Sequence, residues 1–498
     1  MSPLLASLSC LCLIAGLFYL DRDKTFRPSK ALWLPIIWIA IAGSRSISAW
    51  FSLRPGSNID NGTSYYLDSS PADVGAFAIL LIASLGVLFS RRRRIKGLLL
   101  ASWPVLLYFS FCLISTSWSY EPDVSLKRWV KAIGDLAMVL VIVSDPKPMV
   151  ALSRLTSRIG FVFFPLSMLF IKYFPMVGRG YTPDGIQMNT GVTTNKNMLG
   201  VILLVISLST LWRVCALWRA KETLDRRRHL YAQMALLVLG AELFRMAHSA
   251  TAIACFVLGG GIILATNLRV FRNRPSRIHA LFVALIVVGG LAFLLGAQGG
   301  VAAALGRDST LSGRKEIWAA VIPAAPNPII GAGFEGFWIS PNVEKFQRAL
   351  VGWWHPEGLN EAHNGYIEVY LNLGLVGLGL IVTVLVVGYM RAAKALRINL
   401  QVGGLFLAYI LVSAVYSFTE AGFRMLDPMW IFLLLGVVGS TGVAIGLFGS
   451  KLRQKPSIAA AERGKTLVER VPEPGWDAAY ASRAVLSPFK SARANNHR

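Results

Sequence analysis

Long apolar runs recur along most of the chain, and they restrict what it can fold into. Each run is about 17 to 22 residues long, the length an α-helix needs to cross the hydrocarbon core of a bilayer. Hydrophobic residues make up 54% and charged residues only 15% of the 498 residues, which is far from the balance of a soluble globular protein. Because backbone polar groups in lipid must be satisfied within the segment, the runs predict an all-α polytopic membrane protein.

The number of spans is expected to be twelve or thirteen. The runs begin near Leu4, Ala31, Val74, Gly97, Val130, Ile159, Met198, Leu230, Thr251, Ala280, Val369, Val402 and Met429. The first run has no basic residue before it and no small-x-small cleavage site after it, so we interpret it as a retained span rather than a signal peptide.

Basic residues are concentrated in short connections between these runs. The net charge of +24 therefore reports membrane topology, with lipid headgroups as the expected partner instead of nucleic acid. The basic connections are Arg91–Arg94 with Lys96, Arg219–Arg228, Arg269–Arg277 and Arg391–Arg397. If all of them are cytoplasmic, the remaining connections face outward, namely those around Asn58, Tyr120, Tyr181, His248 and Arg424 and the long loop 299–368.

Three regions follow from this pattern. Residues 1–72 hold the N-terminal transmembrane helices, and residues 73–450 form the main transmembrane domain with the loop 299–368. From 451 to 498 the apolar pattern stops, and the composition becomes basic with Pro, Ala and Ser. This last region is expected to be a disordered cytoplasmic tail.

The first informative end of the long loop begins at Arg314. Ile317, Trp318 and Val321 follow at helical spacing, which predicts an interfacial helix. A guanidinium forks onto phosphate oxygens and stays charged, so Arg314 could neutralise a lipid pyrophosphate without a metal. A contact with lipid headgroups explains the same residue equally well.

The other informative end of the loop is built around His363. It follows Glu361 closely and precedes Asn364, which could cap a helix beginning near Gly365 and carrying Glu368 in its first turn. Asn364 and Glu368 are expected to contact the substrate beside His363. A histidine near neutral pH can accept a proton from a sugar hydroxyl. A purely structural histidine at the membrane interface is the alternative interpretation.

Further cations are expected on the same outer face. Arg179 and Lys196 flank a polar, glycine-rich connection, and Arg245 lies near the outer end of the eighth run. Together with Arg314 they could bind the two phosphates of one donor. Each could equally be an interfacial anchor, or in the case of Arg245 an arginine snorkelling to the surface.

Several other kinds of site are not supported by the sequence. The segment GAGFEG, residues 331–336, fits the dinucleotide fingerprint formally, but it lacks the strand before it and the helix after it, so we interpret it as a tight turn. No HExxH motif, Cys/His cluster or DxD pattern occurs in the outer connections. The sequence therefore predicts no cofactor and no metal.

Four stretches together resemble the O-antigen ligase-like family, whose members are O-antigen ligases, O-antigen polymerases and exopolysaccharide polymerases. The resemblance covers roughly residues 75–440, and its last two stretches are the most specific. They are STSWSYEPDVSLKR (115–128), TTNKNMLG (193–200), GRKEIW with PNPIIGAGFEGF (313–318 and 326–337), and HNGYIEVYLNLG (363–374).

The resemblance implies a GT-C-like helical glycosyltransferase of the bacterial inner membrane. It would take a glycan from an undecaprenyl-pyrophosphate donor at the periplasmic face, without a metal, and pass it to a glycan or to lipid A core alongside other polysaccharide-assembly proteins. By motif position His363 would be the base and Arg314 a phosphate-binding arginine. Many members have an arginine where this chain has Ala250, so either Arg245 or Arg179 takes the place of the second arginine or its role is lost.

Polymerase and ligase remain open at this point, with exopolysaccharide polymerisation slightly favoured. A flippase or transporter of lipid-linked oligosaccharide is the alternative from a different class. Transporters place charges near the middle of the membrane along several spans. Arg45, which the pattern puts within the second run, is the clearest such charge here.

Overall fold

A computed structural model describes most of the chain. The described residues are 2–23, 27–51, 70–181, 185–220, 222–274, 314–341 and 360–448, with the single positions 277, 280, 284 and 343. Within them the only strands are β1 (Arg179–Tyr181) and β2 (Gln187–Asn189), which form one antiparallel hairpin. The prediction of an all-α protein is confirmed. The tail expected at 451–498 and the middle of the long loop lie outside the described residues.

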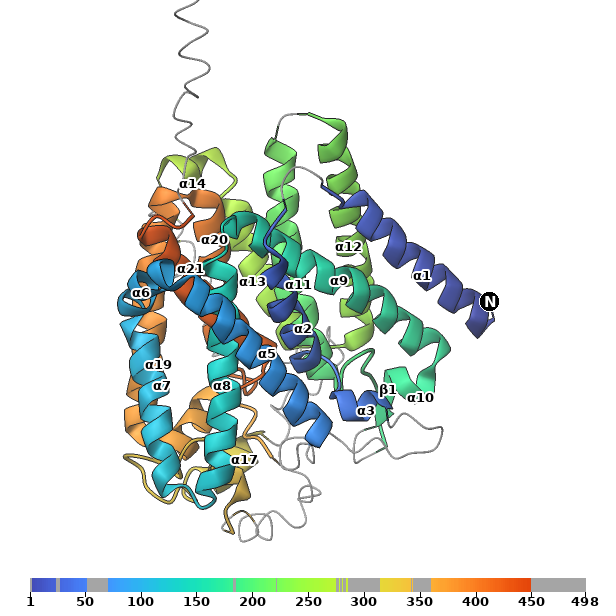
Figure 1. The fold of residues 1–498 in the computed structure, drawn as a ribbon. Helices are drawn as coiled ribbons and strands as arrows, with labels where there is room; N and C mark the ends of the chain where they lie inside the picture. The colour runs from blue at the N-terminus through green and yellow to red at the C-terminus, as the bar shows by residue number, and fades with distance from the viewer. Residues whose placement is uncertain are drawn as a thin grey trace, which may run out of the picture. The chain divides into compact units, whose positions relative to one another are not determined.

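Helices account for the rest of the regular structure (Figure 1). In chain order they are α1 (Pro3–Leu20), η1 (Lys30–Leu32), α2 (Trp33–Ala42), α3 (Ile47–Phe51), α5 (Pro71–Ser90), α6 (Arg92–Ala101), α7 (Trp103–Ser115), η2 (Thr116–Trp118), α8 (Pro122–Val143), α9 (Pro148–Tyr173), α10 (Pro175–Gly178), α11 (Lys196–Arg219), α12 (Leu224–Ala247), α13 (Ala250–Ala265), α14 (Arg269–Asn273), α17 (Arg314–Val321), η3 (Phe337–Ile339), α19 (Gly365–Ile398), α20 (Leu400–Tyr416) and α21 (Pro428–Ala444).

Six of these helices, α1, α5, α9, α11, α12 and α19, are long and apolar enough to cross a membrane. The bent pair formed by α6 with α7 and η2 would make a seventh span, with a bend of 84°. Shorter apolar helices are η1 with α2, α13, α20 and α21. Every predicted run within the described residues coincides with a helix, whereas the run near Ala280 falls almost wholly outside them. The chain is a multi-pass membrane protein.

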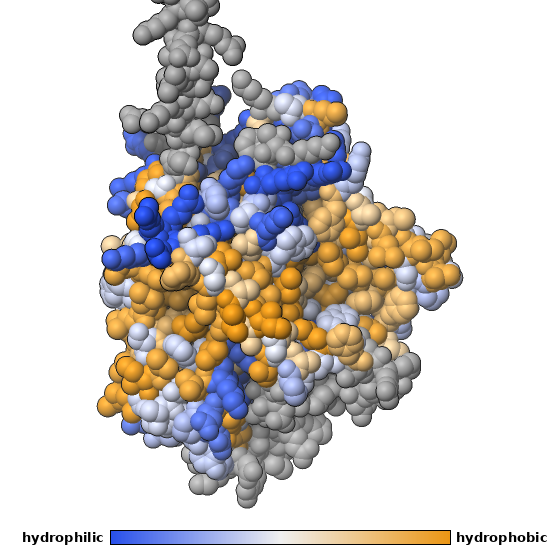
Figure 2. Space-filling model, in the orientation of Figure 1, coloured by the Kyte–Doolittle hydropathy of each residue, from blue (hydrophilic) through white to orange (hydrophobic). Residues whose placement is uncertain are grey.

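The basic connections gather at one end of the helical bundle. Figure 1 shows α6 and α14 at this end, with α17 and the β1 hairpin at the other. At the basic end Arg91 Nη1 donates to the Val141 carbonyl oxygen (2.9 Å), which joins the start of α6 to the last turn of α8. In Figure 2 most of the hydrophilic surface lies above a broad hydrophobic band, and a smaller hydrophilic patch lies toward the lower end. This separation agrees with the topology predicted from charge.

The connections predicted to face outward meet at the opposite end. Asn189 Nδ2 donates to the Met246 carbonyl (2.9 Å), joining the hairpin to the end of α12. Arg45 also lies at this end, in the connection after α2, where it donates to the Val177 carbonyl (2.5 Å). The prediction that Arg45 lies within a span was wrong, because α2 ends at Ala42 and the chain turns before the arginine. Arg45 within a span was the observation that most favoured a transporter, and the structure does not support it.

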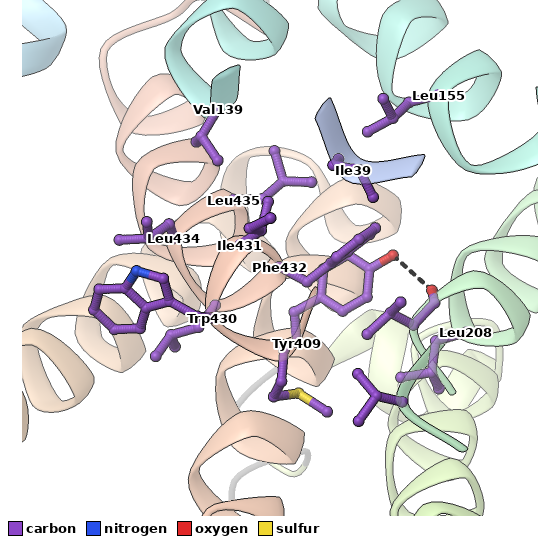
Figure 3. Close-up of a cluster of buried hydrophobic side chains, with 14 of the residues drawn as sticks. Ile39, Val139, Leu155, Leu208, Tyr409, Trp430, Ile431, Phe432, Leu434 and Leu435 are labelled. Atoms are coloured by element: carbon purple, nitrogen blue, oxygen red, sulfur yellow. Dashed lines mark hydrogen bonds between the residues drawn. The ribbon is translucent and has the colours of Figure 1, made fainter. Parts of the chain in front are cut away.

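The centre of the bundle is a close-packed apolar core around α20 and α21 (Figure 3). Tyr409 stacks edge-on against Phe432 with ring centroids 5.0 Å apart, and its hydroxyl donates to the Val205 carbonyl of α11 (3.2 Å). Gly439 lets α21 approach Phe406 of α20, because a Cβ there would lie 2.4 Å from the phenyl ring. This rigid core holds the outer ends of α11, α19, α20 and α21 together.

Candidate functional site

Arg314 and Glu420 form the centre of a polar cluster at the end of the bundle that is predicted to face outward, which we call the outer end. Arg314 is the first residue of α17, and its Nη2 donates to Glu420 Oε1 (2.8 Å). The helix is held by its apolar face, on which Ile317 and Val321 are buried, and by Trp318 Nε1, which donates to the Ala362 carbonyl (2.8 Å). The predicted helix is thus confirmed, and its packing sets the position of the guanidinium.

Glu420 links three separate segments, although no sequence motif marks it. It lies in the connection between α20 and α21, and its side chain is 6% exposed. Besides Arg314, its carboxylate accepts a hydrogen bond from Asn197 Nδ2 of α11 (3.0 Å) and lies 3.7 Å from His363 Nδ1. Arg314 and Asn197 lie 106 and 223 residues away from it in the chain, so only the fold could reveal these partners.

His363 lies in a tight turn immediately before α19. Its φ of 48° is in the left-handed region, and the turn is fixed by Asn364, whose side chain accepts from the Tyr366 and Ile367 amides (3.0 and 3.1 Å). The Gly365 amide also donates to the Ser417 carbonyl (2.7 Å). The predicted cap and helix start are confirmed, and they place the histidine beside the connection that carries Glu420.

Two carboxylates surround the His363 ring. Nδ1 lies 2.7 Å from Glu361 Oε1, although the ring N–H does not point along this contact as in a hydrogen bond. Burial lowers the pKa of His363, but Glu361 and Glu420 outweigh it and raise that pKa to about 10. Burial likewise opposes ionisation of Glu361, yet His363 with Arg424 and Arg314 lowers the pKa of Glu361 to about 2. With these neighbours, the His363 ring is a charged imidazolium at neutral pH.

A second ion pair adjoins the first. Arg424 Nη2 lies 3.4 Å from Glu335 Oε2, and its Nη1 lies 3.8 Å from Glu361. Arg128, buried near the start of α8, donates to the backbone carbonyl of Glu335. Glu335 is the acidic residue of GAGFEG, and the positive φ of Gly331 (68°) agrees with the predicted turn. The motif therefore supplies a carboxylate to the cluster.

Asn364 and Glu368 act as supports for this turn. Glu368 is buried and accepts from Trp338 Nε1 (2.9 Å) and from the Ala362 amide. The Asn364 side chain also donates to the Phe418 carbonyl (3.1 Å). Both were expected near the substrate, and the structure gives both of them hydrogen bonds within the protein that order the loop around His363.

The other expected cations lie at different distances from the cluster. Lys196 begins α11 and directly precedes Asn197, a partner of Glu420. Arg179 Nε donates to the Ile171 carbonyl (3.0 Å) beside the hairpin. Arg245 forms a two-pronged pair with Glu242 (2.8 and 2.7 Å), and its side chain is 72% exposed. Of these three, only Lys196 adjoins the cluster.

The spacing of the acidic groups also suits a metal ion. One ligand atom each of Glu361, His363 and Glu420 lies within 4.8 Å of the others. The same carboxylates already face Arg314 and Arg424, whose charges offset theirs and would repel a divalent cation. The described residues therefore bring a candidate metal-ligand set and two arginines together at this place.

Comparison with known proteins agrees with this geometry. Residues 234–382, which include Arg314 and His363, match the family model described as O-antigen ligase. The chain is also 25% identical over 450 residues to the exopolysaccharide production protein ExoQ of Rhizobium meliloti (strain 1021), a match covering 85% of this chain and 98% of that protein. These two matches support a similarity to the O-antigen ligase-like family. Asn197 and Glu420 fall outside the residues that the family model matches, and the fold adds them to the site.

Proposed function

We propose that this protein is a polysaccharide polymerase or ligase. It would move a glycan from an undecaprenyl-pyrophosphate donor to a sugar hydroxyl at the periplasmic face of the bacterial inner membrane, in exopolysaccharide or O-antigen biosynthesis. The observation that carries the proposal is the meeting of Arg314, Glu361, His363 and Glu420 at the outer end of the bundle. The name of the similar protein, exopolysaccharide production protein, favours the exopolysaccharide branch.

Arg314 is proposed to hold the donor pyrophosphate. Arg314 donates to the Glu420 carboxylate, and a phosphate oxygen of the donor would take the place of that carboxylate. The acceptor oxygen then bonds to the anomeric carbon, and the bond from that carbon to the pyrophosphate breaks. The leaving pyrophosphate keeps the electron pair, its charge is stabilised by Arg314, and attack from the opposite side inverts the anomeric centre.

His363 is proposed to take the proton from the acceptor hydroxyl. The base form of the ring requires loss of its own proton, and the raised pKa of about 10 means that this form increases as the pH rises toward 10. A His363 that stays charged would instead bind the leaving pyrophosphate together with Arg314. The pH dependence of the transfer rate distinguishes these roles, because only the first predicts a rate that rises above neutral pH.

Transfer is proposed to need no metal, since arginines can neutralise the pyrophosphate. The test uses purified full-length protein in lipid nanodiscs with a lipid-linked oligosaccharide donor, in the presence and absence of EDTA. We expect the same rate in both conditions. A rate that collapses with EDTA and returns with a divalent cation would show that Glu361, His363 and Glu420 bind a metal during turnover.

Deletion of the gene tests the wider assignment. Loss of a polymerase leaves short lipid-linked units in the periplasm, whereas loss of a ligase leaves long unattached chains there. Retention of the units on the cytoplasmic side would contradict both and indicate a flippase. Complementation with His363→Ala or Arg314→Gln should fail to restore product, while protein abundance in the membrane stays at the level of the unaltered chain.

A further inference from the structure

An exposed aromatic side chain lies beside the candidate site and has no part in the proposed chemistry. Phe418 follows the end of α20 and is 59% exposed. Its ring lies 4.7 Å from that of Tyr366, centroid to centroid, with an interplanar angle of 40°. Tyr366 is itself half-buried and rests edge-on against Phe423 (5.1 Å, 88°). The two outer rings form an aromatic surface on a buried base.

The backbone under these rings is firmly held. The Phe418 carbonyl accepts from Asn364 Nδ2 (3.1 Å), and the Tyr366 hydroxyl donates to the Ala414 carbonyl (2.9 Å). The Gly365 amide donates to the Ser417 carbonyl (2.7 Å) and the Glu420 carbonyl (3.0 Å). The surface is therefore preorganised, and it shares its backbone with His363 on one segment and with Glu420 on the other.

Polar residues neighbour the two aromatic residues in the chain. Glu361 and His363 precede Tyr366, and their side chains remain 30% and 21% exposed. Thr419 follows Phe418, and its Oγ1 donates to Thr251 Oγ1 of α13 (3.3 Å). A pyranose ring has an apolar C–H face, which the electron-rich face of an aromatic ring attracts, and a rim of hydroxyls that such polar side chains can bind. A lipid chain has no hydroxyl groups for these side chains.

We propose that Tyr366 and Phe418 form a sugar-stacking subsite, which binds a pyranose ring of the acceptor glycan and orients its hydroxyl toward His363. This inference rests on the proposed function, because it names the part of the site that recognises the acceptor. It makes Phe418 a specificity-determining residue, with Tyr366 holding it in place from beneath.

The first test compares Phe418→Leu with Tyr120→Leu in full-length protein in nanodiscs. Tyr120 is a matched control, since it lies in the outer connection between η2 and α8 and is 58% exposed. Loss of one stacked aromatic should raise the KM for the acceptor about five- to tenfold in Phe418→Leu, with kcat within about twofold. Tyr120→Leu should match the unaltered protein, and Phe418→Trp should retain a low KM.

Binding is measured separately from catalysis. The probe is a free oligosaccharide released from the host polysaccharide by mild acid, observed by saturation-transfer NMR with the detergent-solubilised protein. Transfer to the sugar C–H protons should be strong with the unaltered chain, weak with Phe418→Leu and retained with Tyr366→Phe, which keeps the ring. A KM and an NMR signal for Phe418→Leu equal to those of Tyr120→Leu would overturn the subsite.

The two proposals fail in different ways. If the unaltered protein binds the oligosaccharide through Phe418 but transfers no glycan, the proposed function is wrong and the subsite stands. If the unaltered protein transfers glycan while Phe418→Leu changes only with the lipid composition of the nanodisc, Phe418 is an interfacial anchor. That result removes the subsite and leaves the proposed transferase intact.

Discussion

Two clusters of ionic side chains lie at opposite ends of the bundle, and they differ in how far solvent reaches them. At the basic end, Asp21 contacts Arg154, Arg213 Nη2 (2.5 Å) and His229 Nδ1 (3.2 Å), and each of these side chains is at most 10% exposed. We call this group the inner clasp. The outer cluster around Glu420 also combines arginines, a histidine and carboxylates, but Glu361 and His363 keep 30% and 21% of their side chains exposed.

The difference shows how a structural ion network is told from a candidate site. The partners of Asp21 come from α9, α11 and α12, so the clasp fastens the end of α1 to three other helices. The outer cluster ends in a partly open edge, where a ligand can compete with an internal carboxylate. Both clusters contain buried ion pairs, but only the outer cluster has side chains that solvent or a ligand can reach, those of Glu361 and His363.

The two clusters also respond to opposite extremes of pH. Burial alone would raise the pKa of Asp21, but Arg213, His229 and Arg154 lower it to about 2. The pKa of His363, in contrast, is raised to about 10 by its carboxylate neighbours against the effect of burial. The Asp21 carboxylate is therefore ionised at any ordinary pH, whereas His363 of the outer cluster can still lose its proton at high pH.

The largest effect is expected from Asp21→Asn. The change leaves two buried arginines without their main counter-charge, which costs about 3–5 kcal/mol of stability. We expect a much lower thermal transition in detergent, measured by tryptophan fluorescence, with Asp23→Asn as a milder control because Asp23 lies 3.5 Å from Arg154 and is 21% exposed. A transition temperature unchanged from the unaltered protein would show that the clasp does not fasten α1.

Arg314→Gln should act on the rate instead. Removing a charged donor from a developing pyrophosphate charge lowers turnover by about 10²- to 10³-fold. The thermal transition should fall less than in Asp21→Asn, and Arg314→Lys should recover only part of the rate because it keeps the charge without the fork. If Arg314→Gln lowers stability and leaves the rate per folded molecule intact, the outer cluster has a structural role, like the inner clasp, and no role in transfer.

Glu361→Gln tests the protonation state of the site. Glu361 is the largest favourable influence on the His363 cation, so its removal should lower the pKa of His363 from about 10 toward the ordinary value of 6.5. The rising limb of the pH–rate profile should then move to lower pH. A limb at the same pH in both proteins would mean that a group other than His363 gives up the proton.

The two clusters should also differ in how much they contribute to the loss of stability at high pH. A raised pKa means that His363 contributes its full stabilisation below about 6.5 and loses it as the pH rises through about 10. His363→Gln should therefore remove part of the alkaline decline in transition temperature, whereas Asp21→Asn should leave this decline in place. Parallel alkaline declines in unaltered and His363→Gln protein would contradict the assignment.

The smallest effect is expected from Arg245→Gln. The arginine is mostly exposed and pairs with Glu242 on the surface of α12, an arrangement that contributes little in water. Transfer rate and transition temperature should both stay at the values of the unaltered protein. A clear rise in the KM for the donor would restore Arg245 as a phosphate-binding residue.

Much of the local structure of this protein followed from the sequence. Apolar runs of span length predicted the helices, and the basic connections predicted which ends lie together, because both depend on the solvent each residue meets. The cap at Asn364 and the helix at Arg314 also follow from neighbouring residues. Arg314 and His363 could be selected because each stands in a distinctive local motif.

Only the tertiary structure could supply the partners of these residues. Glu420 has no local motif, and it reaches Arg314, Asn197 and His363 because α11, α17, α19 and α20 converge. The prediction placed Arg45 within the second span because hydropathy alone does not show that the helix ends and the chain turns after Ala42. The charge state of His363 likewise depends on two carboxylates brought to it by the fold. Single candidate residues could be predicted from the sequence because their local motifs mark them. Contacts between candidate residues could not, because they form only when the helices pack.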